Sequence, residues 1–332
     1  MTSAPSGSSP RRDVAPTSAP AGGDRVVVDV DLGVQLGAVR LHNPVLAASG
    51  CFSSGREMDR FYDVDRLGAV IVKSITLEPR EGLPTPRMAE TPAGMLNAIG
   101  LQNPGIERWL ATDLPWLQHR GVAVIASIAG KTVDEFRQVA RRLRGQPGVV
   151  GVEVNISCPN VEDRNIVFAC RAEPSAAVIE AVRREVGVPV FAKLTSDVTD
   201  ITEIARAVVA AGAHGLSLIN TLLGMAIDVE TRRPKLANTF GGLSGPAIRP
   251  IAVRNVWQVR HALPGVPIIG MGGVATAEDA VELMLAGADA VAVGTANFTD
   301  PFAAVEVVDG LARWCAAHGV EAVRHLSGAA RA

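Results

Sequence analysis

Short apolar runs alternate with helix-like segments along most of the chain from residue 43 onward. The runs are rich in Val, Ile and Ala and mostly lack a strict polar alternation, which is typical of parallel strands that are buried on both faces. The segments between them carry helix start signals, such as Thr132 followed by Glu135 and Asp200 followed by Glu203. The runs that we expect to form strands are Pro44–Ala48, Ala69–Lys73, Val122–Ile128, Gly151–Ile156, Val190–Lys193, Gly215–Ile219, Val266–Gly270 and Ala290–Val293.

Eight strand–helix repeats predict an α/β fold, the (β/α)8 TIM barrel. Two β-like runs ahead of the repeats, Val26–Val30 and Ala38–Leu41, predict an N-terminal β-hairpin. Two connections, residues 74–105 and 220–247, are too long to be simple loops. Both leave the carboxyl ends of strands, so we expect these long insertions to cover the mouth of the barrel. An open dinucleotide-binding sheet is the alternative fold, but its GxGxxG motif is absent.

Composition divides the 332 residues into three parts. Residues 1–25 are mostly Pro, Ser, Ala and Gly, and we expect a disordered tail, because such a segment cannot bury enough apolar surface to offset the entropy of ordering. Residues 26–320 form the predicted barrel domain, and residues 321–332 a C-terminal extension. The tail has no apolar core of a signal peptide.

Charge and cysteine usage narrow the classes of partner. A net charge of −2 favours neither nucleic acid nor a basic membrane anchor, and no apolar run approaches the roughly 20 residues that span a bilayer. The four cysteines lack CxxC spacing and the histidines are scattered, so we expect no metal site. Free thiols without a secretion signal indicate a reducing compartment, the cytoplasm.

One strand leads directly into a reactive loop. The alternating run Val152–Ile156 is followed by Ser157-Cys158-Pro159-Asn160, where proline ends the strand. A thiol at the carboxyl end of a barrel strand lies where this fold places its chemistry. Cys158 could act as a nucleophile or as a general base, and no histidine has an evident claim to pair with it. Cys51, Cys170 and Cys315 are interpreted as small buried residues.

Other strand ends carry groups that suit an anionic ligand. Lys73 and Lys193 close two apolar strands in matching positions. A strand-end lysine can also be a surface residue whose ammonium reaches solvent, but a matched pair favours an anion. Gly270–Gly273, Gly294–Thr295 and Gly242–Gly245 follow late strands or precede a helix. Glycines can simply make turns, yet this fold often binds phosphate at these loops, so we predict a phosphate site.

In this order and spacing, the residues resemble dihydroorotate dehydrogenases of class 1, and most closely the catalytic subunit of class 1B. The resemblance covers about residues 28–310. Its matching segments are Ala48–Phe52, Lys73–Thr76, Glu90–Pro104, Asn155–Asn160, Ile219–Leu223, Gly241–Ala247, Gly270–Gly273 and Val293–Ala296.

The resemblance implies a role for each matching residue. Cys158 would be the base that takes the C5 proton of dihydroorotate while C6 delivers hydride to N5 of FMN. The residues implied to hold FMN are Ser49, Lys73, Ser74, Ser127, Asn155, Lys193, Ile219, Gly245, Gly272, Gly273, Gly294 and Thr295. The residues implied to hold the substrate are Lys73, Asn97, Ala98, Ile99, Gly100, Leu101, Asn155, Asn220 and Thr221. Ser127 departs from the pattern, because close relatives often carry asparagine there.

The resemblance also implies a pathway and partners. The expected reaction is oxidation of (S)-dihydroorotate to orotate in pyrimidine (UMP) biosynthesis, with electrons passed to NAD through a partner subunit that carries FAD and a 2Fe–2S cluster. A homodimer, and a heterotetramer with that subunit, would follow. The chain itself has neither a cysteine cluster for such a centre nor a Rossmann fingerprint.

Several alternatives remain open. Within the same family, the enzyme could be a fumarate-linked class 1A dehydrogenase. Another flavin barrel that acts on dihydropyrimidines or dihydrouridine is a second possibility. A barrel that serves only as a docking subunit would not need the thiol, the two lysines and the phosphate glycines together. A phosphate-binding isomerase would leave the Asn155–Asn160 loop unexplained.

Overall fold

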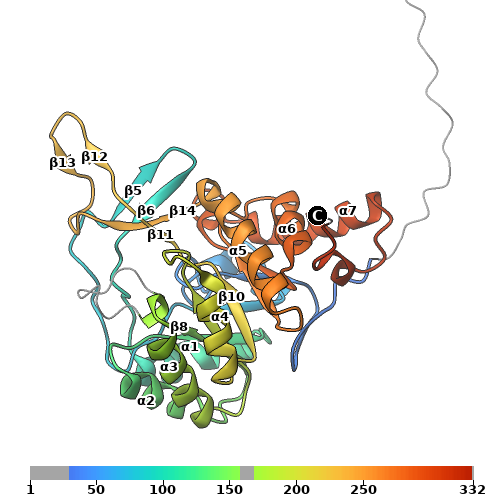
Figure 1. The fold of residues 1–332 in the computed structure, drawn as a ribbon, viewed down its shortest axis with the longest axis horizontal. Helices are drawn as coiled ribbons and strands as arrows, with labels where there is room; N and C mark the ends of the chain where they lie inside the picture. The colour runs from blue at the N-terminus through green and yellow to red at the C-terminus, as the bar shows by residue number, and fades with distance from the viewer. Residues whose placement is uncertain (1–29, 158–167, 331–332) are drawn as a thin grey trace, which may run out of the picture.

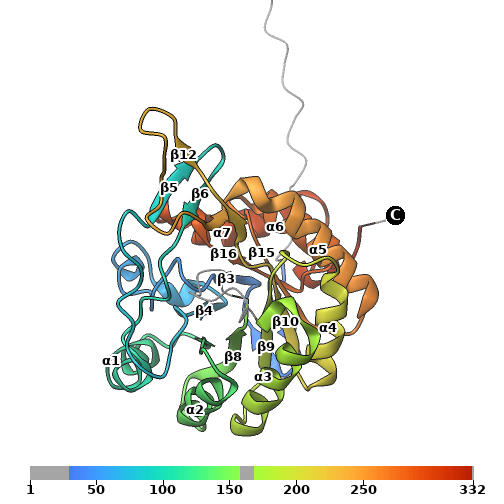
Figure 2. The same cartoon turned by 60° about the vertical axis from the view of Figure 1, so that its left-hand side comes forward.

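The computed structural model describes residues 30–157 and 168–330. Eight parallel strands close into a barrel in the order β3-β4-β7-β8-β9-β10-β15-β16, so the predicted TIM barrel is confirmed (Figure 2). All eight predicted strands occur, with ends shifted by a few residues. Their bounds are β3 Val45–Ala47, β4 Ala69–Ile71, β7 Val124–Ile128, β8 Val149–Asn155, β9 Val190–Leu194, β10 Gly215–Leu218, β15 Ile268–Met271 and β16 Ala290–Val293.

The α-helices of the described residues surround the barrel (Figure 2). The predicted caps are present: the Thr132 side chain accepts from the Glu135 amide, and the Asp200 side chain accepts from the Thr202 amide. The first crossover, from β3 to β4, contains only the 3-10 turns Met58–Arg60 and Val64–Arg66. The helices are α1 Ile106–His119, α2 Val133–Leu143, α3 Ala172–Glu185, α4 Ile201–Ala210, α5 Arg249–Ala262, α6 Ala277–Ala286 and α7 Ala303–Ala317.

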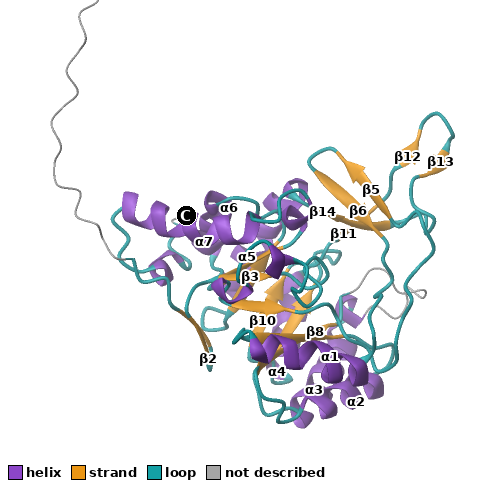
Figure 3. Cartoon of the chain, turned by 180° about the vertical axis from the view of Figure 1, so that it is seen from behind, coloured by secondary structure: helices purple, strands orange, loops and turns teal. Residues whose placement is uncertain are grey.

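The two long insertions meet above the barrel, as their positions predicted. The first contributes β5 (Met88–Thr91) and β6 (Gly94–Asn97), and the second contributes β11 (Leu222–Gly224) and β14 (Gly241–Ser244). These strands form one small sheet in the order β11-β14-β6-β5, which stands apart from the barrel in Figure 1. The second insertion also forms a hairpin of two short strands, β12 (Ile227–Asp228) and β13 (Arg233–Pro234), seen at the edge of the molecule in Figure 3.

The N-terminal hairpin exists, but its first strand was placed wrongly. It pairs β1 (Val34–Leu36) with β2 (Val39–Leu41) across Gly37, whose φ is +60°. Val30 is not in a strand, and residues 26–29 lie outside the described part of the chain. In β1, Val34 and Leu36 are buried and Gln35 is exposed, which is the alternation expected of a strand with one buried face. The hairpin lies at the amino ends of the barrel strands, because Gly37 faces residues that precede β10 and β15.

The barrel strands are almost entirely buried, which explains why they read as continuous apolar runs. Residues 321–330 pack beside the start of the described chain: Asp31 pairs with Ala322, and Val323 is fully buried. No helix in the described ranges is long and apolar enough to cross a membrane.

Candidate active site

A cavity of about 1320 Å³ lies at the carboxyl ends of the barrel strands, beneath the small sheet. Because the carboxyl ends of all eight barrel strands meet at this face, residues distant in sequence converge there. Ser49 follows β3, Lys73 and Ser74 follow β4, and Asn155 ends β8. Residues of both insertions line the cavity from above. Cavity-lining residues that the sequence predicted are Ser49, Lys73, Ser74, Asn97, Ile99, Leu101, Asn155, Lys193, Ile219, Asn220, Thr221, Gly245, Gly272, Gly273, Gly294 and Thr295.

Lys193 is held from below by a buried carboxylate. Its Nζ lies 3.6 Å from Oε1 of Glu153, and the two side chains are 5% and 0% exposed. Lys193 Nζ also donates to Ser49 Oγ at 2.9 Å, and Ser49 Oγ donates to Glu153 Oε1 at 2.9 Å. An isolated ammonium would be costly in this interior, so the carboxylate keeps a positive charge available at the cavity floor.

A second series of hydrogen bonds leads from the same carboxylate to the other side of the cavity. Ser127 Oγ donates to Glu153 Oε1 at 3.0 Å and lies 3.0 Å from Ser74 Oγ. Asn155 Nδ2 donates to Ser74 Oγ at 2.9 Å. Ser127 is fully buried and does not line the cavity. It therefore contacts residues of the cavity wall, and the wall separates it from the cavity itself.

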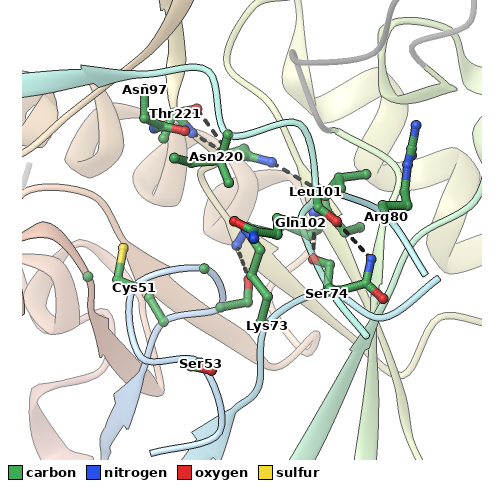
Figure 4. A pocket seen from close by; sticks show the side chains of 18 of the residues that line it. Cys51, Ser53, Lys73, Ser74, Arg80, Asn97, Leu101, Gln102, Asn220 and Thr221 are labelled. Atoms are coloured by element: carbon green, nitrogen blue, oxygen red, sulfur yellow. Dashed lines mark hydrogen bonds between the residues drawn. The ribbon is translucent and has the colours of Figure 1, made fainter. Parts of the chain in front are cut away.

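Asn220, at the start of the second insertion, is hydrogen-bonded to the end of β8 and to the residue that precedes Cys158. Its Nδ2 donates to Ser157 Oγ at 2.8 Å, to the Ser157 carbonyl at 3.2 Å and to Asn155 Oδ1 at 3.2 Å. Its own Oδ1 accepts the Thr221 amide at 2.8 Å. In Figure 4, Asn97, Asn220 and Thr221 lie across the cavity from Lys73. Amide groups and an ammonium thus face one another over the space.

The predicted phosphate loops also converge. Gly272 and Gly273, after β15, have φ values of +120° and +80°, and Gly245 has +92°. A Cβ on Gly273 would lie 2.7 Å from the Arg249 Cβ. Thr295 Oγ1 donates to Ser244 Oγ at 2.8 Å, joining the loop after β16 to β14. Bare backbone at these positions suits a phosphate, which binds N–H groups.

Three predicted residues of the wall do not reach the cavity, and one cannot be placed. Besides Ser127, these are Ala98 and Gly100, which do not line it although their neighbours Ile99 and Leu101 do. Ala98 is fully buried and packs with Leu96 and Leu236 under the small sheet. Gly100, at φ +75°, shapes the loop. Cys158 lies outside the described residues; its predecessor Ser157 is buried.

The sequence interpretation missed Glu153, which lies beneath the cavity beside Lys193. It also did not identify the charged residues of the outer wall, such as Arg80 and Arg108. Arg80 and Gln102 appear beside Leu101 in Figure 4. A carboxylate inside an otherwise apolar barrel strand was the available signal for Glu153, because a buried charge requires a partner.

The other three cysteines were all interpreted as small buried residues, but they differ in exposure. Cys315, in α7, is fully buried as predicted, but Cys170 is exposed, so that prediction was wrong. Cys51 lines the cavity. Burial raises the pKa of the Cys51 thiol, and the nearby charges of Lys73 and Lys193 oppose that rise. Cys51 is therefore a neutral thiol at neutral pH. Across residues 30–157 and 168–330, no group of three or more His, Cys, Asp or Glu side chains could hold a metal ion.

Comparisons with known proteins agree on one family. Residues 31–314 match the family model described as dihydroorotate dehydrogenase. The catalytic subunit of dihydroorotate dehydrogenase B (NAD(+)) from Geobacillus sp. (strain WCH70) is 53% identical over 277 residues, covering 83% of this chain and 88% of that protein. The subunit of the same name from Desulforamulus reducens is 50% identical over 301 residues, covering 91% and 99%.

The fold has a close counterpart among solved structures. A crystal structure of DHODH from Eimeria tenella, in complex with ferulenol, superposes with a TM-score of 0.76 at 23% identity. The match covers 93% of this chain and 91% of that one. At this identity the likeness bears on the barrel fold alone.

Proposed function

This chain belongs to the dihydroorotate dehydrogenase family, and from that premise we propose that it oxidises (S)-dihydroorotate to orotate in pyrimidine biosynthesis. The observation that carries the proposal is the convergence of Lys73, Lys193, Asn155 and Asn220 around one cavity at the carboxyl ends of the barrel strands. Orotate is a planar anion with amide edges. Ammonium groups complement its carboxylate, and asparagine amides complement its edges, donor to acceptor.

The cavity suits FMN as the cofactor. The cavity-lining residues Gly245, Gly272, Gly273, Gly294 and Thr295 would hold the phosphate, because backbone without a Cβ lets its N–H groups approach the anion closely. Lys193 would favour negative charge on the ring system. When bound, FMN supplies a two-electron hydride acceptor. The other residues proposed to hold it are Ser49, Lys73, Ser74, Asn155 and Ile219, with Ser127 supporting Ser74 from behind.

The substrate would lie between the first insertion and the strand ends. Lys73 would bind the carboxylate, and Asn97, Asn155, Asn220 and Thr221 would bind the ring. Ile99 and Leu101 would exclude water from one side, while Ala98 and Gly100 would shape that loop. A dry, amide-lined space strengthens each hydrogen bond to the substrate and disfavours rings that lack its donors and acceptors.

Cys158 is proposed as the base that takes the proton from C5 of dihydroorotate. The proposal rests on its place directly after Ser157, which Asn220 and Asn155 hold by hydrogen bonds. A thiolate accepts a proton, and loss of that proton together with hydride from C6 gives the C5–C6 double bond of orotate. The hydrogen bonds of Ser157 would fix the chain just before the base.

The electron acceptor is proposed to be NAD, reached through a partner subunit in the cytoplasm. The support is the name of the curated relatives, "catalytic subunit" of an NAD(+)-linked enzyme, at 50–53% identity. The partner would carry FAD and a 2Fe–2S cluster. We further propose a homodimer of this chain, joined by two such partners into a heterotetramer.

Anaerobic reduction tests the proposal. The purified protein should be yellow, and dihydroorotate should bleach the flavin absorbance without oxygen. Reoxidation by NAD should require the co-expressed partner subunit. Reoxidation by fumarate, without any partner, would instead indicate a class 1A enzyme. Absence of bleaching by dihydroorotate, with bleaching by another dihydropyrimidine, would reassign the substrate.

A further inference from the structure

Glu153 lies at the meeting point of two hydrogen-bonded arms beneath the cavity. Its Oε1 accepts from Ser49 Oγ at 2.9 Å and from Ser127 Oγ at 3.0 Å, and Lys193 Nζ is 3.6 Å away. The side chain is fully buried and does not line the cavity. One arm ends at Lys193 and the other at Asn155, and both of these residues do line it.

The carboxylate sets the direction of the longer arm. An ionised carboxylate only accepts hydrogen bonds, so Ser127 must donate its single hydroxyl proton to Glu153. The bond between Ser74 and Ser127 is then donated by Ser74, whose oxygen accepts from Asn155 Nδ2. Asn155 consequently turns its Oδ1 toward Asn220 and Ser157, which both donate to it.

The shorter arm holds a charge. Lys193 donates to Ser49, and Ser49 donates to Glu153. The negative charge of Glu153 therefore acts on any group beside Lys193, although Glu153 itself touches neither the cavity nor its contents. Opposite charges only a few ångströms apart in a buried setting interact strongly, so removing one of them changes the potential at the cavity floor.

We propose that Glu153 is a positioning residue with two separable effects. Its charge sets the reduction potential of the flavin next to Lys193, and its acceptor oxygen fixes the amide orientation of Asn155 for orotate. The inference rests on the proposed function, since it assumes that FMN and orotate occupy this cavity. The two effects travel along different arms, so different substitutions separate them.

The first variant is Glu153→Gln, which removes the charge and keeps an oxygen that can accept from Ser49 and Ser127. Without the negative charge, the reduced anionic flavin is favoured. The ratio of the affinities for reduced and oxidised FMN should rise about tenfold, which raises the two-electron potential by ~30 mV. Orotate affinity, read from the change in flavin absorbance on titration, should stay close to that of the wild type.

The second variant is Ser127→Ala, which breaks the arm toward Asn155 and leaves every charge in place. Asn155 then loses its fixed orientation, and orotate should bind about five- to tenfold more weakly, the loss expected of one hydrogen bond. The flavin potential should change much less than in Glu153→Gln, because no charge is removed. Ser217→Ala is the matched control: Ser217 is a fully buried serine beside Lys193 in the barrel register, and its Oγ has no hydrogen-bond partner among the described residues. It should alter neither quantity.

The outcomes separate this inference from the proposed function. Wild-type protein without flavin, or not bleached by dihydroorotate, would refute the proposed function itself. If the wild type does carry flavin, two results would overturn the inference. One is a flavin potential in Glu153→Gln that is equal to or lower than that of the wild type. The other is an orotate affinity in Ser127→Ala that is equal to that of the wild type. Thermal unfolding of the flavin-loaded variants identifies loss of folding. If Glu153→Gln does not fold, the Ser127→Ala titration still decides whether the arm orients Asn155.

Discussion

Asn220 and Ser157 are joined by two hydrogen bonds, from one amide nitrogen to the Ser157 hydroxyl at 2.8 Å and to its carbonyl at 3.2 Å. The pair connects a residue just after β10 with the residue that precedes Cys158. A residue at the start of one insertion therefore holds the segment that leads into the proposed base. Substrate binding and proton transfer would depend on the same side-chain amide.

Asn220→Asp should disrupt this connection at almost constant volume. A carboxylate oxygen would replace the amide nitrogen that now donates hydrogen bonds to three oxygens. Loss of these bonds corresponds to roughly 1.5–3 kcal/mol. We expect kcat/KM for dihydroorotate to fall about 10- to 100-fold. The matched control is Asn238→Asp, an exposed asparagine in the same insertion, which should retain activity. Equal activity of both variants would contradict the role of Asn220.

Much of the barrel could be predicted from the sequence because burial on both faces gives each strand its own apolar run. The first strand of the hairpin was misplaced, since Val26–Val30 is as β-like as Val34–Leu36 and only the turn at Gly37 distinguishes them. Local pattern cannot show the stagger of neighbouring strands. That stagger brings Glu153 of β8 beside Lys193 of β9, so the ion pair was not foreseen.

The part of the candidate site that could be predicted consists of residues that the resemblance places at the ends of strands. Lys73, Asn155 and Lys193 line one cavity because the fold brings such ends together. The contiguous run Asn97–Leu101 lies only partly in the cavity wall. Ile99 and Leu101 line the cavity while Ala98 and Gly100 do not, because the loop turns here: Gly100 and Leu101 adopt φ values of +75° and +57°. Ser127 is fully buried beside Ser74, and its predicted role at the cofactor stays a prediction.

Lys73→Ala should weaken orotate binding. Lys73 lines the cavity on the side opposite Asn220 and Thr221, and a charge-assisted hydrogen bond contributes about 1.5–3 kcal/mol, or 10- to 100-fold in Kd. Titration of the flavin spectrum with orotate measures the change. Lys131→Ala, at an exposed lysine outside the cavity, is the control and should bind orotate normally. Unchanged orotate affinity in Lys73→Ala would remove Lys73 from the substrate site.

Gly273→Ala should impair FMN binding. Gly273 has a φ of +80°, and a Cβ there would lie 2.7 Å from the Arg249 Cβ, so the loop must shift. We expect FMN to bind at least about tenfold more weakly when apoprotein is reconstituted, equivalent to ~1.4 kcal/mol. Gly187→Ala provides the control, because no atom lies within 4 Å of its added Cβ. If Gly273→Ala purifies with a full complement of FMN, the phosphate site lies elsewhere.

Cys51 should react slowly with alkylating agents at neutral pH. Burial raises the pKa of its thiol, so the reactive thiolate is scarce until the pH exceeds the ordinary cysteine value. Lys73 opposes the rise, and therefore Lys73→Ala should raise the pKa further and slow alkylation at any given pH. Mass spectrometry of Cys51 peptides after timed exposure to iodoacetamide, in a Cys158→Ala background, measures both effects. Rapid labelling of Cys51 at pH 7 would contradict them.

Cys158→Ala should keep FMN and lose most turnover. General base catalysis contributes about 10²- to 10⁴-fold, and the methyl group cannot accept the C5 proton. FMN content should remain full, because the proposed phosphate residues follow β14, β15 and β16 and are unaffected. Cys170→Ala is the matched control, since Cys170 is an exposed thiol outside this cavity, and it should turn over normally. Anaerobic stopped-flow measurement of flavin bleaching by dihydroorotate compares the two variants. A bleaching rate near that of the wild type in Cys158→Ala would exclude Cys158 as the base and would direct attention to the serines around Asn155.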